Sequence, residues 1–298
     1  MSSLDGPFLG TEAVAARLVT KRTLHSRFEM VHRNVYVPRG YRLTPQTRAV
    51  AAWLASGRSA TVAGLSAAAL HGSLWIDADL PAELIRGSAS NDDGIVVHRE
   101  RLQPGERCVA QGVPATTPAR TAFDLGRRKG LTKAVIRVDA LANATRLRRE
   151  QVEEVARRHR GARGIVQLRE VVDLMDAGAE SPQETRTRLL LIRAGLPRPT
   201  TQIRVGSWRI DMGYQDCLVG IEYDGPQHWT DPARRTADID KSAGLGARGW
   251  RIVRVNNELL RYRPHVVIAR VCDALRAAGC LWLAECSIDP RFLRRGVA

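Results

Sequence analysis

The stretch at residues 208–224, WRIDMGYQDCLVGIEYD, predicts two neighbouring strands that each carry an acid. Asp211 lies in the first apolar run, and Glu222 lies in the second, eleven residues later. Because a short turn between the runs reverses the chain, we expect the strands to pair and to bring both carboxylates to one edge of a sheet. Carboxylate oxygens are ligands that Mg²⁺ prefers, and Mg²⁺ held in this way supports phosphodiester cleavage. The stretch therefore predicts a divalent-metal site.

A third acid, Asp224, follows Glu222 by two residues and lies on the same side of a regular strand. It is either a further metal ligand or the start of a turn with Gly225, and the local pattern leaves both interpretations open.

The elements around this stretch predict a mixed α/β domain of order α-β-β-β-α-β-α. The runs at 219–221 and 252–255 are apolar at consecutive positions, which is typical of central strands covered by helices on both faces. We expect helices at 183–194, 235–248 and 265–278, and strands at 202–205, 208–214, 218–224 and 250–255.

The bulk composition favours a soluble protein that binds a polyanion. The chain has 298 residues, 44% hydrophobic and 26% charged, and no uninterrupted apolar run of the length that spans a membrane. The N-terminus has no secretory signal pattern, so we expect a cytoplasmic protein. The net charge of +15 and the pI near 10.6 make nucleic acid the first partner to consider. An arginine-rich codon bias would give the same charge, so the charge alone does not decide the partner.

The five cysteines are odd in number and scattered, and none forms a Cys-x-x-Cys motif. This pattern argues against a disulfide framework and against a structural zinc site, so we expect reduced, mostly buried thiols.

The first 176 residues predict two further regions. Helices near residues 11 and 21–28 precede a strand and turn at 34–40, which is the wing position of a winged helix-turn-helix. Short β-like runs at 82–86 and 94–99 then predict a small sheet, and helical patterns continue to residue 175. We therefore expect a winged helix-turn-helix region at 1–75, an α+β region at 76–176, and the mixed-sheet domain at 177–298.

Four motifs between residues 180 and 278 match those of a known nuclease group. They are SPQE at 181–184, RID at 209–211, IEYDG at 221–225 with His228, and the segment that runs from 238–241 to Arg254 and Val255. This part of the chain resembles the very-short-patch-repair-like branch of the PD-(D/E)xK nuclease superfamily.

The resemblance implies roles for individual residues. Asp211 and Glu222 would hold Mg²⁺ or Mn²⁺, and Glu184 would bind a metal water or a second ion from its helix. His228 would orient or deprotonate the attacking water, and we assign Gln227 beside it to DNA contact. The lysine that names the superfamily would stand at 224, where this chain has Asp; Lys241 either supplies a substitute or is an exposed helix lysine.

The N-terminal part is similar to the AbiEi-like antitoxin family of bacterial abortive-infection systems. The matching pieces are the helix-turn-helix with its wing, LSAAALHG at 65–72, and TPARTAFD at 117–124. The resemblance implies DNA binding through Arg22, Arg27, Arg33 and Arg39, whereas a solvated basic face is the structural alternative.

Together these patterns predict a DNA-binding, Mg²⁺-dependent endonuclease in DNA repair or in defence against foreign DNA. The alternative is a non-catalytic transcriptional regulator or antitoxin with a degenerate nuclease fold. DNA is the expected partner, no membrane is expected, and a homodimer and a toxin or repair partner stay open.

Overall fold

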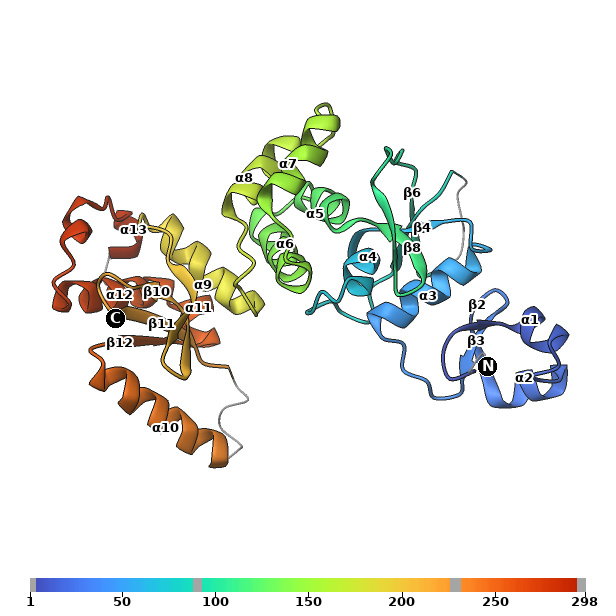
Figure 1. Cartoon of the computed structure of the whole chain (residues 1–298), viewed down its shortest axis with the longest axis horizontal. Coiled ribbons are helices and arrows are strands. Elements are labelled where there is room, and N and C mark those ends of the chain that lie inside the picture. Colours follow the sequence, from blue (N-terminus) through green and yellow to red (C-terminus); the bar gives the residue numbers. More distant parts are fainter. Residues whose placement is uncertain (1–3, 88–92, 226–231, 294–298) are drawn as a thin grey trace. The chain divides into compact units, whose positions relative to one another are not determined.

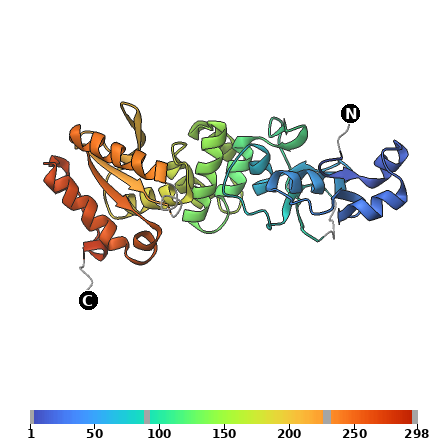
Figure 2. The same ribbon diagram turned by 90° about the horizontal axis from the view of Figure 1, so that it is seen from below.

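The computed structural model describes residues 4–87, 93–225 and 232–293, which form two compact units (Figures 1 and 2). One unit comprises Met1–Ala177 and the other Gly178–Ala298. Each unit has its own sheets and its own hydrophobic core. No helix in the described ranges is long and apolar enough to cross a membrane.

The first unit begins with a short strand, two helices and a β-hairpin, where the winged helix-turn-helix region is expected. The side chain of Thr20 caps the second helix by accepting the Thr23 N–H at 3.1 Å. Asn34 makes the hairpin turn in the left-handed region, at φ 63°, and its Oδ1 accepts the Thr11 N–H at 3.0 Å. The elements are β1 (Phe8–Leu9), α1 (Gly10–Ala15), α2 (Lys21–Arg27), β2 (Phe28–His32) and β3 (Val35–Pro38), with sheet order β1-β3-β2.

A five-stranded sheet follows, and it crosses the boundary expected at residue 75. Strand β4 and helix α4 precede that residue, yet β4 lies at the centre of the sheet and Leu70 of α4 packs in one core with Leu84 of β5. The elements are α3 (Pro45–Ala55), β4 (Thr61–Val62), α4 (Gly64–Leu70), β5 (Ala82–Ile85), β6 (Ile95–His98), β7 (Arg107–Ala110) and β8 (Val113–Thr116), with sheet order β6-β5-β4-β8-β7.

Four helices complete the first unit (green in Figure 1). Helix α5 packs against α6, α7 and α8. Gly126 of α5 lets α8 approach, because a Cβ there would lie 2.5 Å from Leu168 Cδ1. The helices are α5 (Pro118–Gly126), α6 (Leu131–Thr145), α7 (Arg149–Arg158) and α8 (Ile165–Leu174).

The second unit contains the expected series α-β-β-β-α-β-α, with the short helix α11 before the last expected helix and a 3₁₀ helix and α13 after it. Its sheet is mixed, because β11 pairs with β12 in parallel while β10 pairs with β9 and β11 antiparallel. The elements are α9 (Pro182–Arg193), β9 (Thr200–Val205), β10 (Trp208–Tyr214), β11 (Val219–Tyr223), α10 (Pro232–Ala247), β12 (Arg251–Val255), α11 (Asn257–Tyr262), α12 (Pro264–Ala277), a 3₁₀ helix (Leu281–Glu285) and α13 (Pro290–Leu293), with sheet order β12-β11-β10-β9.

Helices cover both faces of this sheet. Met212 packs with residues of α9 and α12 on one face, whereas Ile210 packs with Leu245 of α10 on the other. Residues two apart on a regular strand share a face, so β10 is irregular between these two positions. On the facing strand Gln202 adopts φ 53°, a left-handed conformation that is unusual for a side chain of its kind. The irregularity is centred on Asp211.

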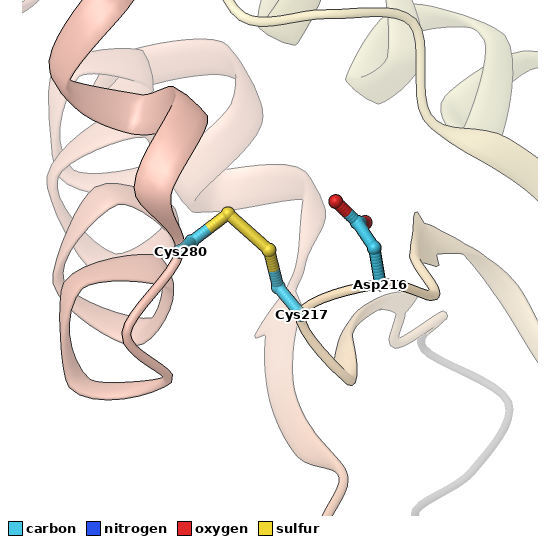
Figure 3. Close-up of side chains that lie close together, drawn as sticks. All are labelled: Asp216, Cys217 and Cys280. Carbon is cyan, nitrogen blue, oxygen red and sulfur yellow. A yellow bond between two sulfur atoms is a disulfide. The ribbon is translucent and has the colours of Figure 1, made fainter.

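The cysteine prediction is wrong for one pair. Cys217 and Cys280 form a disulfide with a Cα–Cα distance of 5.5 Å (Figure 3). They lie 63 residues apart in sequence, and the fold brings the turn after β10 to the end of α12. Cys108, Cys272 and Cys286 are free.

Candidate functional site

Two paired strands bring the predicted carboxylates together. The antiparallel register sets Met212 opposite Ile221. Asp211 and Glu222 are the next residues of the two strands, and both line the same hollow. Asp211 is held in place by the N–H of Tyr223, which donates to its Oδ2 at 2.8 Å. The convergence expected from the sequence is therefore present.

Helix α10 contributes a cation to this pair. Lys241 Nζ lies 2.6 Å from Glu222 Oε1, and the side chains are 24% and 14% exposed. The contact makes an ion pair of Lys241, so the alternative interpretation as an exposed helix lysine is wrong.

A small polar hollow of about 110 Å³ surrounds these groups. Asp224 lines it at the end of β11, and its N–H donates to the Val255 carbonyl at 2.7 Å, which extends the pairing with β12. Arg254 lines the hollow from β12, where the parallel register places it beside Glu222. The full lining is Asp211, Glu222, Tyr223, Asp224, Asp238, Lys241 and Arg254.

Glu184 lies close by but outside the lining of the hollow. Ser181 caps α9 by accepting the Glu184 N–H at 3.1 Å, which fixes the first turn of the helix. The carboxylate of Glu184 accepts the Glu180 N–H at 3.0 Å and the Gln202 side-chain amide at 3.2 Å. Gln202 thus joins the glutamate of α9 to the strand that faces Asp211, although sequence reasoning assigned it no role.

Electrostatics set these acids apart from ordinary surface carboxylates. Burial raises the pKa of Glu184 to about 7, and the negative charge of Asp211 adds to the effect. The pKa of Asp211 is raised by burial and by Glu222, against the opposing hydrogen bond from Tyr223. Carboxylates with raised pKa that face one another gain most from a nearby cation.

The donor set fits a hard divalent cation. Asp211 and Glu222 offer carboxylate oxygens from adjacent strands, and Asp224 offers a third within the same hollow. Gln202 Oε1 is buried and accepts no hydrogen bond within the described part of the chain, and the charge of Glu222 Oε1 is shared with Lys241 Nζ. These residues could hold Mg²⁺ or Mn²⁺.

The remaining predicted site residues fall into two groups. His228 and Gln227 lie outside the described residues. Arg22, Arg27, Arg33 and Arg39 are all exposed on the winged region, as a DNA-contacting set would be. Arg39 is partly committed within the fold, because its guanidinium donates to the carbonyls of His25 and Ser26 at 2.9 and 2.8 Å.

A second cluster of candidate metal ligands, at the disulfide, has structural partners instead. The ligand atoms of Asp216, Cys217 and Cys280 lie within 4.8 Å of one another (Figure 3). The two sulfurs are bonded to each other, and Asp216 Oδ2 accepts the indole N–H of Trp282 at 2.6 Å. The cluster holds the turn after β10 against the 3₁₀ helix.

Comparison with known families finds a match in each unit. The AbiEi antitoxin C-terminal domain matches residues 59–174. The restriction endonuclease-like family REase_MTES_1575 matches residues 185–275. These matches confirm both resemblances expected from the motifs, and they assign a nuclease-like domain to the unit that contains Asp211 and Glu222.

Two Mycobacterium tuberculosis proteins are similar over most of their length. They are the uncharacterized protein MT2308 of strain CDC 1551 / Oshkosh and the uncharacterized protein Rv2248 of strain ATCC 25618 / H37Rv. Each is 32% identical to this chain over 197 residues, which is 62% of this chain and 71% of the relative.

Proposed function

We propose that this chain, which belongs to the protein family of the Mycobacterium tuberculosis protein MT2308, is a DNA-binding, Mg²⁺-dependent DNA endonuclease that acts in DNA repair or in defence against foreign DNA. The observation that carries the proposal is the pair of carboxylates from adjacent strands, Asp211 and Glu222, beside Lys241 in a polar hollow of a restriction endonuclease-like domain.

Asp211 and Glu222 are the proposed metal ligands, and Asp224 is the third candidate. A bound Mg²⁺ or Mn²⁺ ion lowers the pKa of water and neutralises the charge that develops on the scissile phosphate. Glu184 and Gln202, which are joined by a hydrogen bond of 3.2 Å, keep the strand opposite Asp211 in place.

Lys241 is the proposed substitute for the motif lysine that Asp224 replaces. Its ammonium group lies beside Glu222, so it can contact a phosphate oxygen or the attacking water next to the carboxylates. His228 stays a prediction as a further partner for that water. Arg254 adds a second cation to the hollow, where a phosphate of the substrate would enter.

The proposed DNA contact lies on the winged region. The side chains of Arg22, Arg27 and Arg33 extend from α2 and from the β2–β3 turn, all exposed. Since the net charge is +15, release of counterions from DNA would add to the affinity and make it fall with salt.

Cleavage of plasmid, nicked, mismatched and branched DNA with Mg²⁺ or Mn²⁺ tests the proposal. We expect Asp211→Asn to lower the cleavage rate roughly a hundredfold or more, because a ligand that stabilises developing charge is lost. Asp240→Asn is the matched control, since Asp240 is an exposed acid one residue before Lys241 and does not line the hollow. Full activity of Asp211→Asn would contradict the proposal.

A second candidate function, a non-catalytic regulator or antitoxin, is favoured by the AbiEi match at 59–174. Thermal unfolding with and without Mg²⁺ separates the two. If the site binds Mg²⁺, the folded protein is stabilised by about 2.7 kcal/mol at a Mg²⁺ concentration a hundred times the dissociation constant. Glu222→Ala removes that stabilisation. An equal change of the melting temperature with Mg²⁺ in the wild type and in Glu222→Ala favours the function as a non-catalytic regulator.

A further inference from the structure

A pocket of about 590 Å³ lies in the unit 1–177, far larger than the carboxylate hollow of the other unit. Its volume falls within the range of roughly 300–1,000 Å³ that is typical of small-molecule sites. Ala63 and Gly64 at the start of α4, together with Ile85 at the end of β5, give it an apolar floor. The pocket therefore has room and surface for an organic ligand.

Four cationic side chains line the same pocket. Arg127, Arg128 and Lys129 follow α5, and Arg163 comes from the segment before α8. The two acids of the lining, Glu100 and Asp124, already accept Arg127 Nη2 at 2.9 and 3.0 Å. The two negative charges of the lining are thus already paired with an arginine of the protein.

Arg128 forms an ion pair with Glu83, which leaves two cations of the lining without an acidic partner within the described residues. The side chains of Lys129 and Arg163 are exposed, and neither has an acidic partner within the described residues. The rim of the pocket consequently has a surplus of positive charge.

The pocket is built before any ligand arrives. Arg128 Nη1 donates to Glu83 Oε1 at 2.9 Å, and the same buried glutamate accepts the Leu65 N–H at 3.0 Å. A Cβ at Gly64 would collide with this ion pair, and the backbone φ of 52° there also favours glycine. Arg127 Nη1 is fixed by the Arg163 carbonyl at 3.0 Å. These contacts of Arg127 and Arg128 fix the shape of the pocket wall without a ligand.

We propose that this pocket binds a nucleoside phosphate, with the sugar or base on the apolar floor and the phosphate on Lys129 and Arg163. Inorganic phosphate alone would leave the floor and most of the volume unused. An uncharged apolar ligand would cover the two cations without offering them a partner, which costs binding energy. The nucleotide is either free or the phosphorylated end of a nucleic acid strand.

Fluorescence anisotropy with the full-length protein tests the proposal. The probes are an N-methylanthraniloyl-labelled ATP and a short labelled oligothymidylate with and without a 5′-phosphate. EDTA prevents metal-bridged binding to Asp211 and Glu222, and a salt concentration of about 0.15 M screens exposed charges beyond roughly 8 Å. The variant is Lys129→Ala with Arg163→Ala. The control, Lys133→Ala with Arg169→Ala, removes two exposed cations of the same unit that do not line the pocket.

We expect the pocket variant to bind at least tenfold more weakly than wild type and the control to bind normally. Binding of labelled ATP identifies a free nucleotide as the ligand, and binding of the 5′-phosphorylated strand alone identifies a strand end. The proposal is overturned by a lack of binding to every probe, by an equal loss in the control, or by pyrophosphate competing as well as the nucleotide.

Discussion

The two units of this chain surround their buried acids with opposite partners. In the unit 1–177, burial raises the pKa of Glu83, yet hydrogen bonds from His98 and Arg128 bring it down to about 2. In the unit 178–298, Glu184 is buried to a comparable degree, and burial raises its pKa to about 7 with the negative charge of Asp211 adding to the rise. The two pKa values therefore differ because a guanidinium group contacts Glu83, and not because the two side chains differ in burial.

This contrast separates an acid that supports structure from one that can receive a ligand. Glu83 has its cation within the fold, whereas Asp211 accepts a backbone N–H and has its pKa raised by the charge of Glu222. An external cation would add little at Glu83 and much at Asp211. Asp124 in the first unit is intermediate, since burial raises its pKa even though Arg120 lies beside it.

The largest expected effect is loss of the central arginine of the first unit. Arg120 is 1% exposed and contacts Glu106 at 2.5 Å, Glu100 at 2.6 Å and Asp124 at 2.9 Å. Arg120→Ala leaves these acids without their shared cation, so we expect the free energy of unfolding to fall by about 3–5 kcal/mol. Urea unfolding measures it. Arg157→Ala, which breaks an exposed pair with Glu154, should cost about 1 kcal/mol or less. Equal losses of unfolding free energy in Arg120→Ala and Arg157→Ala would contradict the expected role of Arg120 as the cation of the buried acids.

A smaller effect concerns the pH dependence of the first unit. The folded-state pKa of Glu83 is about 2, below the ordinary glutamate value of 4.5, so its contribution to stability is present above pH 4.5 and is lost as the pH falls toward 2. We expect wild type to lose about 2 kcal/mol from this group between about pH 6 and pH 3, and Glu83→Gln to lack that loss. Urea titrations at both pH values give the difference. A parallel decline in the two proteins would show that Glu83 is not the origin.

The smallest expected effect concerns Mg²⁺ binding by the carboxylates of the unit 178–298. Lys241 is the cation that the structure places beside Glu222, so it competes with a divalent ion for that carboxylate. We expect Lys241→Ala to bind Mg²⁺ about threefold to tenfold more tightly, a gain of about 1 kcal/mol, while it cleaves DNA more slowly. Isothermal titration calorimetry measures the affinity. Weaker Mg²⁺ binding by Lys241→Ala than by Lys133→Ala would contradict the competition.

Local sequence patterns predicted the second unit well because its strands are apolar runs and its acids lie within them. Asp211 and Glu222 could be placed opposite each other from the spacing of two strands and one turn. The role of Gln202 could not be predicted, since it depends on a left-handed backbone and on a neighbouring helix. The contact of Lys241 depends on how α10 packs against the sheet, which no local pattern encodes.

Long-range pairing explains the other differences. The sheet of the first unit joins β4 to β5 and β8 across the boundary expected at residue 75. The pairing of Cys217 with Cys280 depends on a turn and a helix end that are 63 residues apart. The commitment of Arg39 to the carbonyls of α2 likewise requires the hairpin to fold back on that helix.

The disulfide also has a topological consequence. It closes a covalent ring that includes β11, α10 and β12, and with them Glu222 and Lys241. A single backbone cut anywhere between the two cysteines opens the ring but releases no fragment. After such a cut, the protein would migrate as one piece on a denaturing gel until a thiol reductant is added, and then as two.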